Sequence, residues 1–189
     1  PAAFGSQTAG SILRPASFCG IVGLKPTYGR VSRHGVVPVS WTLDHVGPMV
    51  RTVADAALLL KVVAGPDPND PTTLPVPVDD YPAAVGQGAA GLRVGVPDRF
   101  FTDLADAESR RAYEAAVTRL KELGLMLRPV RLPGVFEPLR DAHRTIMYAE
   151  AAAFHKKWFA ERPDDYRPRT RRVIQAGMLT PAPLYLRAQ

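Results

Sequence analysis

The segment that most constrains this chain is a loop of small residues that ends at Ser11 and is followed closely by Pro15. Apolar residues precede the loop at 1–4 and follow it at 21–24, which is typical of strands on either side. Proline has no N–H and fits only the first turn of a helix, so the spacing predicts a helix that begins near residues 12–14. Ser11 would then lie where main-chain N–H groups lack intrahelical acceptors and the helix dipole favours negative charge.

Other interpretations of this loop are simpler. Gly5 and Gly10 have the spacing of a phosphate-binding loop, but that motif needs a lysine after its second glycine, where this chain has Ser11. The Gly-x-Ser-x-Gly elbow of many hydrolases is absent around Ser11. A purely structural capping role stays open, because serine is a favoured residue at helix N-termini. On the loop alone, the catalytic and capping interpretations are equally good.

A longer string of residues separates these interpretations. Several blocks resemble, in order and spacing, the conserved core of the amidase signature family of serine hydrolases. The matching blocks are Thr8-Ala9-Gly10-Ser11-Ile12, Pro15-Ala16, Phe18-Cys19-Gly20, Gly23-Leu24-Lys25-Pro26-Thr27, Leu43-Asp44-His45-Val46-Gly47-Pro48-Met49 and Arg51-Thr52-Val53-Ala54-Asp55. The segment 148–152 matches more weakly. The strong resemblance covers about residues 1–70 and is far more specific than one short motif.

The resemblance implies hydrolysis of an amide bond by a Ser–cis-Ser–Lys triad, with Ser11 as the nucleophile. It also implies an oxyanion hole made of main-chain N–H groups, namely those of Thr8, Ala9, Gly10 and Ser11. In the family, the lysine and the second serine precede this region, so we expect them upstream of Pro1. We therefore expect the chain to be a piece of an enzyme and to be inactive alone.

The chemistry explains why such groups are needed. A serine hydroxyl is protonated at neutral pH and needs a base within hydrogen-bond reach, and a lysine can serve only when its pKa is lowered. Removing one oxyanion donor typically costs about 2.7–4 kcal/mol. The sequence offers no evident base: Lys25 lies in the later block, and His45 adjoins Asp44 in sequence, where neighbours do not usually aim at each other. A Ser11–His–Asp arrangement is kept as a less favoured alternative.

Three residues beside the loop are candidates for shaping the site. Gln7 stands where the family commonly has aspartate, and Arg14 lies one residue later than the family arginine, so a neutral arrangement is expected in place of an Asp–Arg pair. Ala9 replaces a glycine, which restricts the backbone at one oxyanion donor. Asp44 is expected either to bond a loop near the active site or only to form an Asx turn before Gly47.

Composition limits the other possibilities. The 189 residues carry a net charge of +6 and a single cysteine, Cys19. One cysteine excludes an internal disulfide and suits a reducing, cytoplasmic setting, and Cys19 is expected to be a small buried hydrophobe. The arginines of 162–172 alternate with acidic residues, which favours a solvated helix face over a nucleic-acid surface. No apolar stretch approaches the roughly 18 residues of a membrane span, so we expect no membrane partner.

The remaining pattern predicts an α/β fold, part of a mixed central sheet flanked by helices. Thr52 and Asp106 are expected to cap helices, and His143 and His155 to be surface or pocket-edge residues on a long helix. Strands are expected at 21–24, 92–96 and 125–132, and helices at 52–63, 106–124, 137–161 and 183–189. One face of the 106–124 helix is expected to be apolar: Ala112, Ala116, Val117, Leu120 and Leu123. We expect one partial domain, 1–189, made of a signature core (1–70), a surface connection (65–90) and an α/β remainder (91–189).

These observations together favour a bacterial amidase that hydrolyses a non-peptide carboxamide through an acyl-enzyme. The alternative is the glutaminase-type component of a tRNA-dependent amidotransferase, and a third possibility is an inert structural fragment. We expect no metal and no cofactor. The expected partners are a small-molecule amide and, as one option, a second copy in a homodimer, with nucleic acid relevant only to the amidotransferase alternative.

Overall fold

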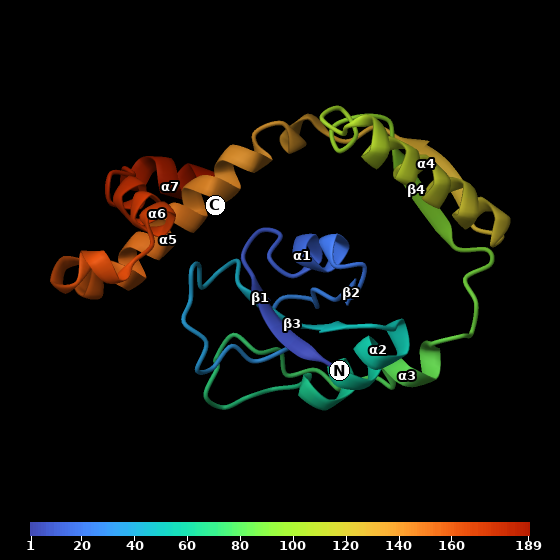
Figure 1. Ribbon diagram of the computed structural model, residues 1–189, viewed down its shortest axis with the longest axis horizontal. Coiled ribbons are helices and arrows are strands. Elements are labelled where there is room, and N and C mark those ends of the chain that lie inside the picture. Colours follow the sequence, from blue (N-terminus) through green and yellow to red (C-terminus); the bar gives the residue numbers. More distant parts are fainter. The chain divides into compact units, whose positions relative to one another are not determined.

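The computed structural model describes all residues 1–189 (Figure 1). Its backbone contacts divide the chain into two compact units. Unit 1 contains residues 1–86 and 142–189, and unit 2 contains residues 87–141. Each unit is described by itself, and the predicted single partial domain stays a prediction.

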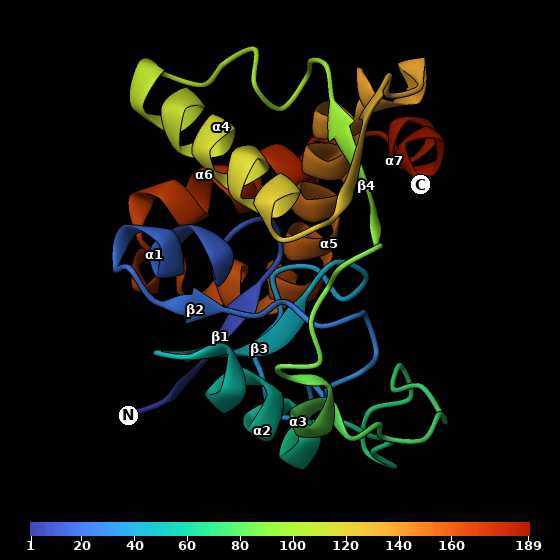
Figure 2. The same ribbon diagram turned by 90° about the vertical axis from the view of Figure 1, so that its right-hand side faces the viewer.

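Unit 1 is built on a three-stranded antiparallel sheet in the order β1-β3-β2. Its strands are β1 (Ala3–Gln7), β2 (Val22–Gly23) and β3 (His45–Val50). The short helix α1 (Leu13–Phe18) lies beside β2, as both views show (Figures 1 and 2). Gly23 permits this close approach, because a Cβ there would lie 2.7 Å from the Ala16 Cβ. The first helix thus begins within the predicted range, and its apolar face contributes the buried Ile12 and Ala16 to the core.

The central strand, β3, was not predicted from the sequence. Proline lacks the N–H that a central strand normally donates, so the Gly47-Pro48 pair argues against a strand there. In the structure Pro48 still takes part, since its carbonyl accepts a hydrogen bond from Leu24 N–H at 3.0 Å. Gly47 is required at its position, because a Cβ would lie 1.9 Å from the Leu24 carbonyl oxygen.

Helix α2 (Val53–Val63) covers the same sheet and begins as the sequence predicts. The hydroxyl of Thr52 accepts a hydrogen bond from Asp55 N–H, which confirms the predicted cap. The following connection carries only a short helix, α3 (Tyr81–Ala84). It is held to the core by Arg30, whose guanidinium donates to the carbonyls of Val76 and Pro77.

The second part of unit 1 is helical (Figure 2). It consists of α5 (Leu139–Glu161), whose first residues belong to unit 2, the 3-10 turn Pro163–Asp165, α6 (Pro168–Met178) and α7 (Ala182–Ala188). Gly177 lets α6 meet α5 closely, because a Cβ there would lie 1.9 Å from the Tyr148 carbonyl oxygen. The basic segment around α6 forms the expected solvated ion pairs, such as Arg171 with Asp164.

Unit 2 is a strand–helix–strand unit with parallel strands. Its elements are β4 (Arg93–Pro97), α4 (Ala107–Glu122), β5 (Met126–Val130) and the 3-10 turn Gly134–Phe136. Asp106 caps α4 through Ser109 N–H, as predicted. The predicted apolar face of α4 is wrong for Ala112, Ala116 and Leu123, which are exposed, because a two-stranded sheet covers only the middle of that face.

The α/β class is confirmed, although the strands of this chain form two small sheets. None of the helices is long and apolar enough to cross a membrane. Two expectations about single residues are wrong. Cys19 is exposed, since it lies at the C-terminal end of a helix of only six residues. His155 is buried, because its ring bonds both the Pro38 carbonyl and the Tyr166 hydroxyl.

Candidate active site

The candidate nucleophile lies in the loop that joins β1 to α1. The strand ends at Gln7 and the helix begins at Leu13, so the loop turns within five residues. Ser11 is exposed, whereas the next residue, Ile12, is completely buried and anchors the turn in the core. The hydroxyl of Ser11 is therefore held at the surface by a rigid attachment one residue away.

Gln7 organises the loop from below. Its side chain is 3% exposed, and its Oε1 accepts hydrogen bonds from the N–H groups of Ile12 (2.8 Å) and Leu13 (3.0 Å). These donors belong to the start of α1, where no intrahelical acceptor exists. Its Nε2 donates to the Ala9 carbonyl at 3.0 Å. One neutral amide thus caps the helix and fixes the loop at once, and its partners are main-chain groups, whereas Arg14 is exposed.

The main-chain donors of the loop point to no acceptor of the chain. The N–H groups of Thr8, Ala9, Gly10 and Ser11 form no hydrogen bond within residues 1–189. The alanine at position 9 is accommodated without strain, since Phe100 is the one non-glycine residue with a positive φ. Four adjacent free donors beside an exposed hydroxyl are suited to bind an anionic oxygen.

Asp44 holds the other side of the loop. Its carboxylate is buried; Oδ1 accepts a hydrogen bond from the Thr8 hydroxyl at 2.5 Å. Oδ2 accepts from the N–H groups of Val39 (2.8 Å) and Ser40 (3.1 Å). Asp44 therefore bonds the candidate loop, and its main-chain donors lie before it in the sequence rather than in an Asx turn toward Gly47.

Helix α5 reaches the same region through two residues. The ring of His143 donates from Nε2 to the Thr8 carbonyl at 3.0 Å. Seven residues later, Glu150 is 1% exposed and accepts from Ser40 Oγ, Thr42 N–H, Thr42 Oγ1 and Tyr185 Oη. Burial, together with the bond to the Glu150 carboxylate, raises the pKa of Tyr185. No sequence signal pointed to the His143 contact, while the weak match at 148–152 was the one signal for Glu150.

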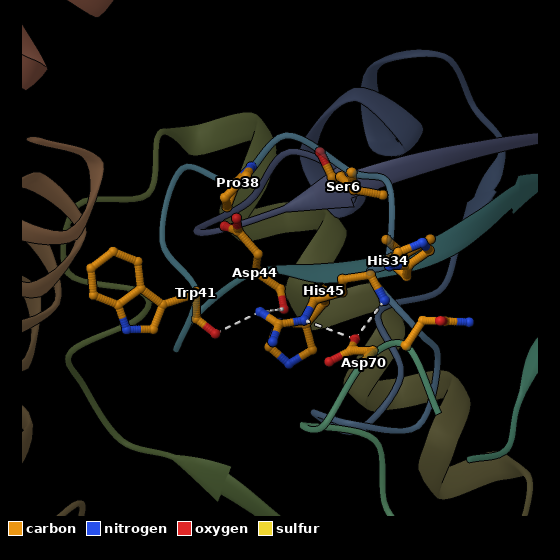
Figure 3. Close-up of a pocket in the computed structure, with 11 residues that line it drawn as sticks. Ser6, His34, Pro38, Trp41, Asp44, His45 and Asp70 are labelled. Atoms are coloured by element: carbon orange, nitrogen blue, oxygen red, sulfur yellow. Dashed lines mark hydrogen bonds and ion pairs between the residues drawn. The ribbon is translucent and has the colours of Figure 1, made fainter. Parts of the chain in front are cut away.

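A small pocket of about 190 Å³ lies on the far side of Asp44 (Figure 3). Its wall includes Ser6, Trp41, Asp44 and His45. Burial lowers the pKa of His45, whose Nδ1 donates to the Leu43 carbonyl at 2.7 Å. Ser11 does not line this pocket, so the Ser–His–Asp alternative that would use His45 gains no support from it.

No other basic group of the chain is seen bonded to Ser11. Lys25 Nζ donates to the carbonyl of the next residue, Pro26, at 3.1 Å. Lys61 pairs with Asp80. No group of three or more His, Cys, Asp and Glu side chains is placed to hold a metal ion. The arrangement thus contains a nucleophile and anion-binding donors, and a base would have to come from other residues.

Comparison with known proteins places the chain among amide-processing enzymes. A family model described as Amidase matches residues 1–185. An amidase of Pseudomonas putida is 46% identical over 188 residues, which is 99% of this chain and 40% of that protein. The GatA-type component of the Glutamyl-tRNA(Gln) amidotransferase of Trichlorobacter lovleyi is 53% identical over 132 residues, 70% of this chain and 27% of that protein.

A solved structure shows the same backbone arrangement. It is described as a vestigial protein complex that reveals the evolutionary origins of an s-triazine catabolic enzyme. It matches with a TM-score of 0.91 and 38% identity, covering 100% of this chain and 40% of that one. This chain therefore spans about 40% of the length of that structure and of the amidase of Pseudomonas putida.

Proposed function

The chain belongs to the amidase family, and from that membership we propose that the intact protein hydrolyses a non-peptide carboxamide through an acyl-enzyme formed on Ser11. Ser11 Oγ attacks the amide carbonyl, the amine departs with a proton, and water then cleaves the ester. The negative charge on the carbonyl oxygen is bound by main-chain N–H groups of Thr8, Ala9, Gly10 and Ser11.

One observation carries this proposal: an exposed hydroxyl at position 11 adjoins four main-chain donors without acceptors. In a purely structural cap, the serine oxygen would accept from the helix start. Here that role is filled by Gln7, which bonds Ile12 and Leu13, so Ser11 is left available.

An acylating probe tests the nucleophile directly. We expect a fluorophosphonate to label the intact protein at Ser11, and S11A to lose both labelling and amide turnover. Ser17 is the matched control, because it is an exposed serine on the same short helix, and S17A should label and turn over like the parent. Labelling and turnover that survive in S11A would overturn the assignment.

The base is proposed to be a lysine acting through a second serine, as the family resemblance implies. The chain's Lys25 and Lys61 are engaged elsewhere, and nothing in residues 1–189 takes that role at Ser11. We therefore expect the isolated 189-residue chain to show no amidase turnover. Turnover by that chain alone would disprove the lysine proposal.

A second candidate is supported by the 53% identity to the amidotransferase component of Trichlorobacter lovleyi. In that case Ser11 would release ammonia from glutamine for use by partner proteins. The two candidates differ in their dependence on partners. Glutaminase activity that appears only with the partner proteins would favour the amidotransferase, whereas hydrolysis of simple carboxamides by the protein alone would favour the amidase.

A further inference from the structure

The candidate oxyanion loop is oriented through its carbonyl oxygens. Three successive carbonyls of the loop each accept one hydrogen bond from a different part of the chain. The Thr8 carbonyl accepts from His143 Nε2 (3.0 Å), the Ala9 carbonyl from Gln7 Nε2 (3.0 Å), and the Gly10 carbonyl from Arg14 N–H (2.9 Å).

Each of these bonds fixes a neighbouring donor. In a planar trans peptide, the C=O of one residue and the N–H of the next lie in one plane and point in opposite directions. Holding the Thr8 carbonyl therefore sets the direction of Ala9 N–H. By the same geometry, Gln7 sets Gly10 N–H, and the first turn of α1 sets Ser11 N–H.

Two of the three bonds are local, and one is not. Gln7 and Arg14 lie within a few residues of the carbonyls they hold, whereas His143 is 135 residues away on α5. A neutral imidazole donates from one nitrogen only, and a carbonyl oxygen only accepts, so Nε2 carries the proton in this contact. That nitrogen is occupied as a donor and cannot act as a base.

We propose that His143 is a positioning residue for the oxyanion hole: through the Thr8 carbonyl it holds Ala9 N–H in the direction needed to bind the charged oxygen. The inference rests on the proposed function of Ser11. Because a preorganised donor acts mainly on the transition state, losing its orientation lowers kcat more than it raises KM.

The test compares two variants of His143 in the intact protein. H143A removes the donor, while H143Q keeps a side-chain N–H at a similar reach from the backbone. We expect kcat of H143A to fall about 10- to 100-fold, less than the 10²–10³ of a deleted donor, with KM near the parent value. H143Q should recover most of the loss. H34A is the control, because His34 is exposed and bonds no part of the loop through its ring.

A transition-state analogue separates positioning from general loss of structure. A boronic acid forms a tetrahedral adduct with a nucleophilic serine, and its affinity should fall in H143A by about the same factor as kcat. Counting active sites with a fluorophosphonate corrects kcat for any unfolded fraction. A merely structural effect would lower the number of active sites and leave kcat per site and boronate affinity unchanged.

The outcomes are distinguishable from failure of the proposed function. Activity retained by S11A would remove the nucleophile itself. If S11A is inactive but H143A keeps parental kcat per site and boronate affinity, the positioning role alone is overturned. It is also overturned if H143Q is as inactive as H143A and both lose the same limb of the pH–rate profile, since that pattern belongs to a general base.

Discussion

At the scale of single residues, the amide of Gln7 explains how this loop works without the charged pair expected from the family pattern. A carboxylate at this position could accept from Ile12 and Leu13 N–H, and the helix dipole would favour its charge. It could not donate to the Ala9 carbonyl, which only accepts. Gln7 therefore combines two functions, capping the helix and orienting the loop.

These two functions can be separated by substitution. We expect Q7A to lower the free energy of unfolding by about 1–3 kcal/mol, because the buried Ile12 N–H loses its acceptor, and to lower kcat as well. Q7E keeps both acceptor contacts, so it should retain more stability than Q7A while still losing kcat. Chemical denaturation and steady-state kinetics measure the two effects. Q175A, at an exposed glutamine on α6, is the control, and a Q7A protein that behaves like Q175A would contradict this explanation.

His45 predicts how stability responds to pH. Burial lowers its pKa from the ordinary value of 6.5, and the charges of Lys25 and Arg33 act in the same direction. The unfolded chain then takes up a proton near 6.5 that the folded protein refuses, so this contribution to stability is complete above 6.5 and is lost as the pH falls toward the lowered pKa.

The corresponding measurement is the free energy of unfolding between about pH 5 and pH 7.5, the range around an ordinary histidine pKa. The parent should gain more stability with rising pH than H45N, whose side chain does not titrate but keeps an N–H near the position that bonds Leu43. H34N shows how much any histidine replacement changes the curve. Parallel curves for the parent and H45N would show that His45 contributes nothing to the pH dependence.

At the scale of elements, α5 supports the site through Glu150. Its carboxylate accepts from Ser40, Thr42 and Tyr185, and the same 39–44 loop carries Asp44, which bonds Thr8. A hydrogen bond to a charged group contributes about 1.5–3 kcal/mol, and a buried donor left without a partner costs about 1–3 kcal/mol. The helix and the candidate nucleophile loop are thus connected through one buried carboxylate.

We expect E150A to lower the free energy of unfolding by about 3 kcal/mol or more and to reduce kcat. E150Q should be milder, because its remaining oxygen still accepts. A tyrosine absorbance titration gives a second measurement: burial is the main cause of the raised Tyr185 pKa, but the Glu150 carboxylate adds to it, so E150Q should lower that pKa toward 10.0. E161A, at an exposed position of the same helix, is the control, and equal stability of E150A and E161A would contradict the role.

Elements set by local signals could be predicted from the sequence, and contacts between distant segments could not. The caps at Thr52 and Asp106 depend on residues three positions away, so α2 and α4 begin where expected. Strand β3 was missed because Gly47-Pro48 interrupts a strand pattern, and its pairing becomes visible only beside its partners. At the candidate site, the residue types at positions 7 and 44 were noticed, but their bonding partners required the folded backbone.

At the scale of the whole molecule, the stretch that the sequence presents as one surface connection has two different parts. Residues 65–80 are held to unit 1 by Arg30, which bonds the Val76 and Pro77 carbonyls, and by Asp70, which accepts from Arg33 N–H. Residues 86–91 include three glycines with positive φ and open space where a Cβ would lie. The boundary between the two compact units falls within this second part.

This difference predicts where a broad-specificity protease first cuts the chain. Proteolysis needs local opening of the backbone, which costs least where packing contacts are few. We expect the first cuts within 85–91 and slower cuts within 66–79, identified by the masses of early fragments. R30A removes the bonds that hold the Val76 and Pro77 carbonyls, so it should accelerate cutting near 75–78 and leave the rate within 85–91 unchanged. First cuts within 66–79 of the parent, or an R30A protein cut like the parent, would show that Arg30 is not what secures this connection.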